Sequence, residues 1–249
     1  MSQVAEKLIA AARELADAVD RLKFGTPVTH VYNPLKYAWE PHQMYLRRFG
    51  NSRKRVIFFG MNPGPFGMAQ TGVPFGEVAM VRDWMGIRAK VAKPALENPR
   101  RPVEGFDCSR SEVSGKRLWG LFAQRFGSAE RFFAEHFVVN YCPLAFCEAS
   151  GCNRTPDKLP SHESEPLRQL CNQHLARVLE ILEPKWIVGV GKFAEERARE
   201  VAPKAHRIGQ ILHPSPASPA ANRDWAGAAT AQLLKLGVWN EASLEVALA

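Results

Sequence analysis

Apolar residues recur at helical spacing near the start of the chain and again in its second half. Within residues 3–23 they stand three or four apart with charged residues between them, at Val4, Leu8, Ala11, Leu15, Val19 and Leu22. This spacing predicts an amphipathic helix packed on a core. A second helix is predicted up to residue 182, with Ser164 and Pro166 as start signals and Pro184 as the stop signal. Shorter helices are predicted over residues 193–201 and 225–236, the last ending near Gly237.

Four short, continuously apolar runs have the length of strands: residues 56–59, 137–140, 186–190 and 208–212. Continuous apolarity is typical of strands covered on both faces. Because helices alternate with these runs, we predict a three-layer α/β/α fold around a central, largely parallel four-stranded sheet. With 249 residues, 46% of them hydrophobic, and with no linker or internal repeat, residues 1–249 are expected to form a single domain with the N-terminal helix packed on it.

A polar residue stands near the end of three of the four predicted strands. Asn62 lies in the Gly- and Pro-rich loop 60–68, Asn140 ends the second run, and His213 follows the fourth. Because ligands bind beyond the carboxyl ends of parallel strands, these groups are expected to share one cleft. The first loop has no carboxylate, and the three loops offer no lysine and no elbow nucleophile, so covalent catalysis is poorly supplied. The set suits holding a water and stabilising developing charge.

Each of these side chains has a chemical and a purely structural interpretation. The carboxamide of Asn140 can pair with adjacent acceptor and donor groups on a heterocycle such as uracil, and Asn62 can hold a water. His213, neutral or protonated, can donate to an oxygen that gains negative charge. Phe75, an aromatic between turn residues, is a candidate stacking platform for an extruded base. The purely structural alternatives are a turn residue for Asn62, a helix cap for Asn140, a hydrogen-bonded loop histidine for His213 and a ring that fills the core for Phe75.

Composition narrows the possible classes of protein. The chain has 33 Lys and Arg against 25 Asp and Glu, a net charge of +8, with a pI near 9.4, as expected of a protein that meets polyanions. No segment has the roughly 20 apolar residues of a membrane span, and no secretory signal begins the chain, so we expect a soluble intracellular protein. Five cysteines indicate free thiols. An iron–sulfur site at Cys142, Cys147 and Cys152 would lack a fourth ligand, so neither metal nor cofactor is expected.

Several motifs resemble the single-strand-selective monofunctional uracil-DNA glycosylases of the uracil-DNA glycosylase superfamily, in a bacterial-type member. They are residues 60–68 with the extension 69–77, then 78–87, 139–144 and 213–216, within a resemblance that runs from Tyr32 to Trp239. The resemblance implies that Asn62 positions the attacking water and that His213 stabilises the uracil anion. It implies that Phe75 stacks on the flipped base and that Asn140 reads its Watson–Crick edge. Further pocket residues implied by it are Met61, Pro63, Gly64 and Met68.

The activity implied by this resemblance is base excision repair by a monofunctional glycosylase. It would hydrolyse the N-glycosidic bond of uracil and 5-substituted uracils such as 5-hydroxymethyluracil, in single- and double-stranded DNA, and leave an abasic site. With no carboxylate beside Asn62, a strongly dissociative mechanism is expected. Alternatives are a glycosylase for hypoxanthine or xanthine, a non-catalytic binder of damaged DNA, and an iron–sulfur glycosylase. We expect a monomer, in the cytoplasm with the nucleoid if bacterial or in the nucleus if eukaryotic.

The segment after His213 is implied to enter duplex DNA, through Pro214, Ser215, Pro216, Ala217 and Ser218. Animal members often carry a basic residue where Ala217 stands, so weaker duplex binding is expected here. Arg223 is a possible substitute or an ordinary surface residue. Arg82, with Arg88 and Lys90, is a candidate contact to the DNA backbone. The basic cluster within residues 47–55 is interpreted as a solvated face.

Overall fold

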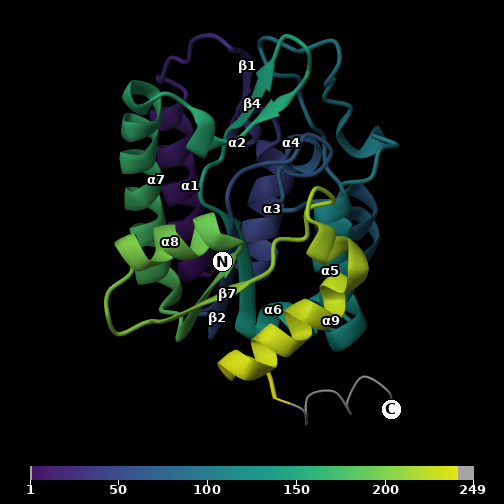
Figure 1. Cartoon of the computed structure of the whole chain (residues 1–249), viewed down its shortest axis with the longest axis vertical. Helices are drawn as coiled ribbons and strands as arrows, with labels where there is room; N and C mark the ends of the chain where they lie inside the picture. The colour runs from purple at the N-terminus through teal and green to yellow at the C-terminus, as the bar shows by residue number, and fades with distance from the viewer. Residues whose placement is uncertain (1, 241–249) are drawn as a thin grey trace.

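A four-stranded parallel sheet forms the centre of the molecule (Figure 1), in a computed structural model that describes residues 2–240. Its strands are β2 (Val56–Gly60), β3 (His136–Asn140), β6 (Trp186–Val190) and β7 (Arg207–Ile211), in the order β3-β2-β6-β7. All neighbouring pairs are parallel. Every residue of β2 and β6 is buried, as their apolar sequences require. The sheet predicted from the four apolar runs is confirmed.

Helices cover the sheet on both sides. The helices α1 (Gln3–Val19) and α7 (Ser161–Leu182) pack together on one side, and α5 (Val113–Phe126) and α9 (Pro219–Leu236) lie on the other (Figure 1). Around them stand α3 (Trp39–Phe49), α6 (Ala129–Glu135) and α8 (Lys192–Val201). The predicted three-layer arrangement is therefore present. No helix in residues 2–240 is long and apolar enough to cross a membrane.

Three helix boundaries differ from the sequence prediction. Helix α1 ends at Val19 rather than near residue 23. Helix α7 begins at Ser161, so Pro166 lies inside it, where the missing N–H removes a single intrahelical bond. Helix α9 begins at Pro219 but is interrupted at Asp224, which has non-helical φ and ψ of −160° and 83°. The Asp224 carboxylate accepts the Gly227 N–H at 2.9 Å and so caps the part that was predicted.

A second, antiparallel sheet was not predicted. It consists of β1 (Val28–Tyr32), β4 (Ala145–Glu148) and β5 (Asn153–Arg154), in the order β1-β4-β5. Only the first and last residues of β1 are buried, so its sequence shows no continuous apolar run. Short helical segments complete the fold: α2 (Pro34–Tyr37), α4 (Met68–Thr71), η1 (Met80–Trp84), η2 (Gly105–Asp107) and η3 (Pro156–Lys158).

An aromatic cluster fixes α5 against the sheet. The ring of Phe122 in α5 lies 5.1 Å from that of Phe58 in β2 and stacks at 4.3 Å on Phe132 of α6. Trp119 packs edge-on against Phe122, and all four rings are fully buried. Large buried aromatic rings contribute much of the packing energy of a core. The start of α5, which reaches the pocket described next, is therefore held on a rigid base.

Candidate active site

Two of the three predicted strand-end segments open into one pocket of about 350 Å³. The loop after β2 contributes several residues, and the segment after β7 contributes His213, in agreement with the position expected at the carboxyl edge of the sheet. The predicted site residues that line this pocket are Met61, Asn62, Pro63, Gly64, Met68, Phe75, His213, Ser215 and Pro216. Asn140, Pro214, Ala217, Ser218 and Arg82 are not among its lining residues.

Asn62 is oriented by the backbone of the segment after β3. Its Nδ2 donates to the carbonyl oxygen of Leu144 at 3.2 Å. The two segments are also joined by backbone bonds, since the N–H of Cys142 donates to the Met61 carbonyl at 2.8 Å. One amide N–H of Asn62 is engaged in this way, and its Oδ1 has no hydrogen-bond partner among residues 2–240, so this acceptor is left for a ligand of the pocket that Asn62 lines. Such an acceptor can hold a water molecule by accepting a hydrogen bond from it.

His213 is held in one tautomer by its own loop. The backbone N–H of Ser215 donates to His213 Nδ1 at 3.1 Å, so Nδ1 is an acceptor and the ring proton sits on Nε2. Burial lowers the pKa of His213 below 6.5, which favours the neutral ring. Of the two protonation states left open by the sequence, the structure supports the neutral one. His213 is thus a neutral Nε2–H donor.

Phe75 forms another wall of the pocket and is held in an unusual backbone conformation. Its φ is +52°, a region that non-glycine residues seldom adopt. Its carbonyl oxygen accepts both the Trp119 Nε1–H, at 3.0 Å, and the Glu77 N–H, at 2.7 Å. The ring lies 6.2 Å from that of His213. The wall of the pocket therefore carries a partly exposed aromatic ring, on a backbone held by two hydrogen bonds.

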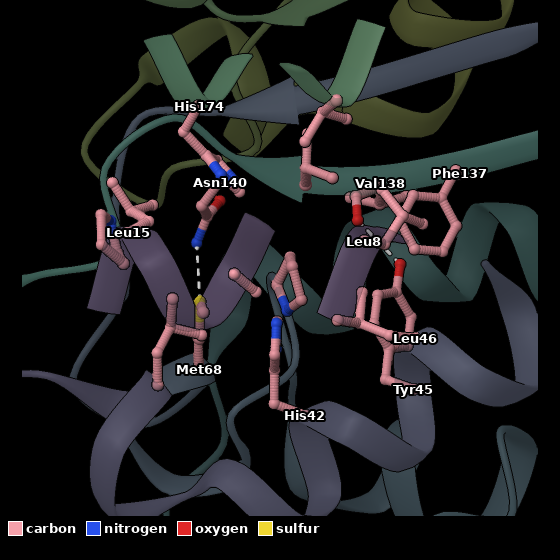
Figure 2. A pocket seen from close by; sticks show the side chains of 16 residues that line it. Leu8, Leu15, His42, Tyr45, Leu46, Met68, Phe137, Val138, Asn140 and His174 are labelled. Atoms are coloured by element: carbon pink, nitrogen blue, oxygen red, sulfur yellow. Dashed lines mark hydrogen bonds between the residues drawn. The ribbon is translucent and has the colours of Figure 1, made fainter. Parts of the chain in front are cut away.

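Asn140 lies beside the pocket rather than on its wall. It lines an inner cavity of about 40 Å³ that also contains Met68, the residue shared with the larger pocket (Figure 2). Its Nδ2 points to Met68 Sδ at 3.2 Å, a weak acceptor. Its Oδ1 is buried and has no partner among residues 2–240. A Cβ placed on Gly60 would lie 3.0 Å from this Oδ1 and 2.5 Å from Phe75 Cζ, so Gly60 separates the two side chains.

Glu112 is a pocket residue that sequence reasoning missed. It lines the same pocket as Asn62, so the expected absence of a carboxylate there is wrong. Its Oε2 packs so closely on Gly64 that a Cβ there would lie 2.3 Å away. Burial raises the pKa of the Glu112 carboxyl, and the backbone N–H groups of Phe66 and Ser114 offset part of the rise. Glu112 stands 44 positions after Met68, the last residue of the first loop, and just before α5, and no strand end or motif marks it in the sequence.

Comparisons with known proteins agree with this site. The family model of the uracil DNA glycosylase superfamily matches residues 47–235. The chain belongs to this superfamily. It is 47% identical over 239 residues to a single-strand selective monofunctional uracil-DNA glycosylase of Rattus norvegicus, covering 94% of this chain and 86% of the rat protein. A Bos taurus protein of the same description is also 47% identical, with 88% of its length covered. The family expected from the sequence is confirmed.

The fold of this superfamily member also matches a solved structure. The crystal structure of wild-type SMUG2 from Pedobacter heparinus superposes with a TM-score of 0.64, covering 92% of this chain and 97% of the SMUG2 chain. The two sequences share 16% identity, so this likeness concerns the fold alone.

The segment expected to contact duplex DNA is clamped by Arg117 of α5. The guanidinium Nη1 donates to the carbonyl oxygens of Pro214 and Ser215, at 3.1 and 3.4 Å. Its Nη2 donates to Asn222 Oδ1 at 2.9 Å, and Asn222 Nδ2 in turn donates to the Pro216 carbonyl at 2.8 Å. The exposed Ala217 lies at the tip of this turn. In this superfamily member the loop after His213 is thus preset by side chains outside it.

Arg82, the predicted backbone contact, is engaged by its own neighbour. Both its Nε and its Nη2 donate to the Asp83 carboxylate at 2.7 Å, and Arg88 lies 3.9 Å from Asp107.

All five cysteines are free thiols, four of them buried. Within residues 2–240 no group of three or more His, Cys, Asp or Glu side chains is arranged to hold a metal ion.

Proposed function

We propose that this protein is a monofunctional uracil-DNA glycosylase that hydrolyses the N-glycosidic bond of uracil in DNA and leaves an abasic site. The observation that carries the proposal is the state of two pocket side chains. Asn62 and His213 each have one polar end fixed by the backbone, so that one presents an acceptor and the other a neutral donor. The relatives named uracil-DNA glycosylases, 46–47% identical over 94% of this chain, support the same activity.

We expect the base to depart ahead of water attack even though Glu112 lines the pocket, because the Glu112 carboxyl packs on Gly64 and Asn62 itself cannot take up a proton. As the glycosidic bond breaks, negative charge collects on the uracil, and the Nε2–H of His213 donates to its O2 oxygen. Such a donor, fixed in place before the charge appears, stabilises the transition state by roughly 3 to 4 kcal/mol. Asn62 Oδ1 accepts a hydrogen bond from the attacking water and aims the water oxygen at the sugar C1′. The proton that this water loses as its oxygen bonds to C1′ passes to the departed uracil anion. No lysine lines the described pocket, which agrees with hydrolysis without Schiff-base chemistry.

Base recognition uses the carboxamide of Asn140, whose Oδ1 has no hydrogen-bond partner among residues 2–240 and whose Nδ2 has only a weak one. Its buried Oδ1 acceptor would take the N3–H of uracil, and its Nδ2 would exchange the weak sulfur acceptor of Met68 for the O4 oxygen of the base. Cytosine presents an acceptor at N3 and a donor at N4, so it mismatches both atoms of this carboxamide. Phe75 stacks on the extruded ring. The backbone of Met61, Pro63 and Gly64, with Met68, forms the remaining wall.

The finer substrate range follows from the family resemblance. The enzyme is proposed to release 5-hydroxymethyluracil as well as uracil, from single- and double-stranded DNA, and to act as a monomer. Its site of action is where the genome lies: the nucleoid in a bacterial cytoplasm, or a eukaryotic nucleus. Contacts with the duplex are assigned to the turn of residues 214–218.

Release of free base from matched oligonucleotides tests the proposal. The panel carries uracil, 5-hydroxymethyluracil, thymine, hypoxanthine or xanthine, in single strands and duplexes. We expect release of the first two only, with borohydride trapping no enzyme–DNA adduct. His213→Ala is expected to lower the single-turnover rate on uracil by about two to three decades, and Asn62→Ala serves as a second inactive variant. Release of purines alone would show a different base preference, and binding without any release would refute the enzyme assignment.

A further inference from the structure

Most of the basic residues near the start of β2 are neutralised by partners. Arg47 pairs with Glu6 at 3.2 Å, Arg48 with Glu130 at 2.6 Å, Arg53 with Glu183 at 2.6 Å and Arg55 with Glu135 at 2.8 Å. These pairs lie at the end of β2 opposite the pocket. They agree with the interpretation of this cluster as a solvated face. The basic side chains that contact DNA phosphates are therefore expected elsewhere on the protein surface.

Two arginines lie beside the pocket without a carboxylate within 4.0 Å among residues 2–240, Arg101 and Arg110. Both are held by Phe66, which belongs to the loop after β2 and follows the pocket residue Pro65. The Arg110 guanidinium lies 4.0 Å from the centroid of the Phe66 ring, and that of Arg101 lies 5.2 Å from it. Arg101 Nε also donates to the Gly151 carbonyl at 2.6 Å.

Arg110 sits on a segment that reaches the pocket, and Arg101 is hydrogen-bonded to another such segment. Arg110 stands two residues before Glu112, and Gly151 stands two residues before Asn153, both of which line the pocket. Asp107, the nearest acidic residue before Arg110, faces Arg88 at 3.9 Å. Stacking on an aromatic ring holds a guanidinium in place while its edge stays available to donate hydrogen bonds.

A nucleotide whose base enters the pocket stays attached to the two phosphates that flank it. These phosphates must lie at the rim, because the base is extruded by rotation about its own backbone. We propose that Arg101 and Arg110, held against Phe66, bind the DNA backbone phosphates next to the excised base. This inference rests on the proposed glycosylase function. It places the phosphate contacts next to the loop after β2, at Arg101 and Arg110, in place of the contact predicted at Arg82. Planar guanidinium groups suit phosphate oxygens in two-point contacts.

Salt dependence of binding measures such contacts directly. The probe is a fluorescent single-stranded oligonucleotide with a stable abasic analogue, titrated with the protein by anisotropy between 50 and 200 mM salt. Each phosphate contact to a single strand contributes about 0.7 to the slope of log affinity against log salt. Arg110→Gln and Arg101→Gln are each expected to lower that slope by this amount. Across the fourfold salt range, each variant then loses roughly 2.5-fold less affinity than the parent.

Arg53→Gln is the matched control, since it removes the same charge from the opposite end of β2. Its slope is expected to equal that of the parent. Unchanged slopes in both rim variants would overturn the proposal, and so would an equal decrease in Arg53→Gln, which would show an effect of net charge alone. Uracil release by the same variants is measured in parallel. A parent that releases no uracil refutes the glycosylase function, whereas an active parent with unaltered variant slopes refutes only this surface.

Discussion

Two buried histidines, His42 and His136, and the partly buried His174 are expected to make the folded protein sensitive to acid. Burial lowers the pKa of His42, His136 and His174 from 6.5 to about 4 in each case. His42 and His174 both line the inner cavity next to Asn140 (Figure 2), and a charge on one disfavours a charge on the other. His174 Nδ1 and His136 Nε2 have no hydrogen-bond partner in the described part of the chain. Desolvation outweighs the backbone hydrogen bonds that favour the charged form of each ring, so protonation of any of the three would place a poorly compensated charge inside the protein.

The sign and size of the effect follow from proton linkage. Between pH 6.5 and pH 4 an unfolded histidine binds a proton that the folded one excludes, so stability is complete above pH 6.5 and is lost as the pH falls. Each histidine contributes a slope of about 1.4 kcal/mol per pH unit, and three contribute about 4. Between pH 8 and pH 5 the summed loss is about 6 kcal/mol, which is similar to the whole unfolding free energy of many domains.

Urea unfolding at several pH values from 8 to 5 measures this loss. His174→Leu removes one of the three titrating groups, so its pH slope below pH 6 is expected to be about one third smaller than that of the parent. His162→Gln is the control, because the His162 side chain is 80% exposed. The reasoning is refuted if the parent loses less than about 1 kcal/mol between pH 8 and pH 5, or if His174→Leu keeps the parental slope.

Three further changes probe the pocket. Glu112→Gln is expected to slow uracil release about tenfold, because the Glu112 carboxyl supports the loop at Gly64. A loss of about a thousandfold, the size expected for Asn62→Ala, would instead show that Glu112 activates the attacking water. Arg117→Met removes the hydrogen bonds that hold the turn after His213. Uracil release from duplex DNA should therefore fall about tenfold more than release from single strands. Equal losses on both substrates would contradict the role of Arg117 in holding this turn for duplex DNA. Gly60→Ala places a Cβ 2.5 Å from Phe75 Cζ and should lower release at least 100-fold with a small change in melting temperature, as thermal denaturation would show.

The central sheet could be predicted because its two inner strands, β2 and β6, are buried at every position. The run from Val56 to Phe59 is apolar at every position, and all of these residues are buried in β2. The second sheet could not be predicted in this way. Strand β1 is buried only at its first and last residues, and it pairs with β4, so that Val31 faces Phe146, more than 100 residues away. Only the folded chain brings these short segments together.

The site was partly visible in the sequence for a similar reason. Asn62 and His213 each follow a strand of the central sheet, and the carboxyl edge of a parallel sheet places them in one pocket. Glu112 precedes a helix and reaches the pocket from the side, through a contact with Gly64 that no spacing reveals. The tautomer of His213 depends on one backbone N–H, that of Ser215, and the engagement of Arg82 depends on the rotamer of its neighbour. Such features are set by local geometry after the chain has folded.

Helix α5 makes the pocket a preset structure rather than one assembled around DNA. Gly115 lets the helix approach so closely that a Cβ there would lie 2.1 Å from the Phe75 carbonyl oxygen, and Trp119 bonds that oxygen. These contacts hold Phe75 at its positive φ, a conformation that costs about 1 to 3 kcal/mol. From the same helix Arg117 fixes the turn after His213, and Glu112 at its start packs on the first loop. Because one rigid element sets the ring of Phe75, the turn after His213 and the first loop together, the donor of the proposed mechanism would already be in place when charge develops on the base, and little reorganisation energy would oppose the reaction.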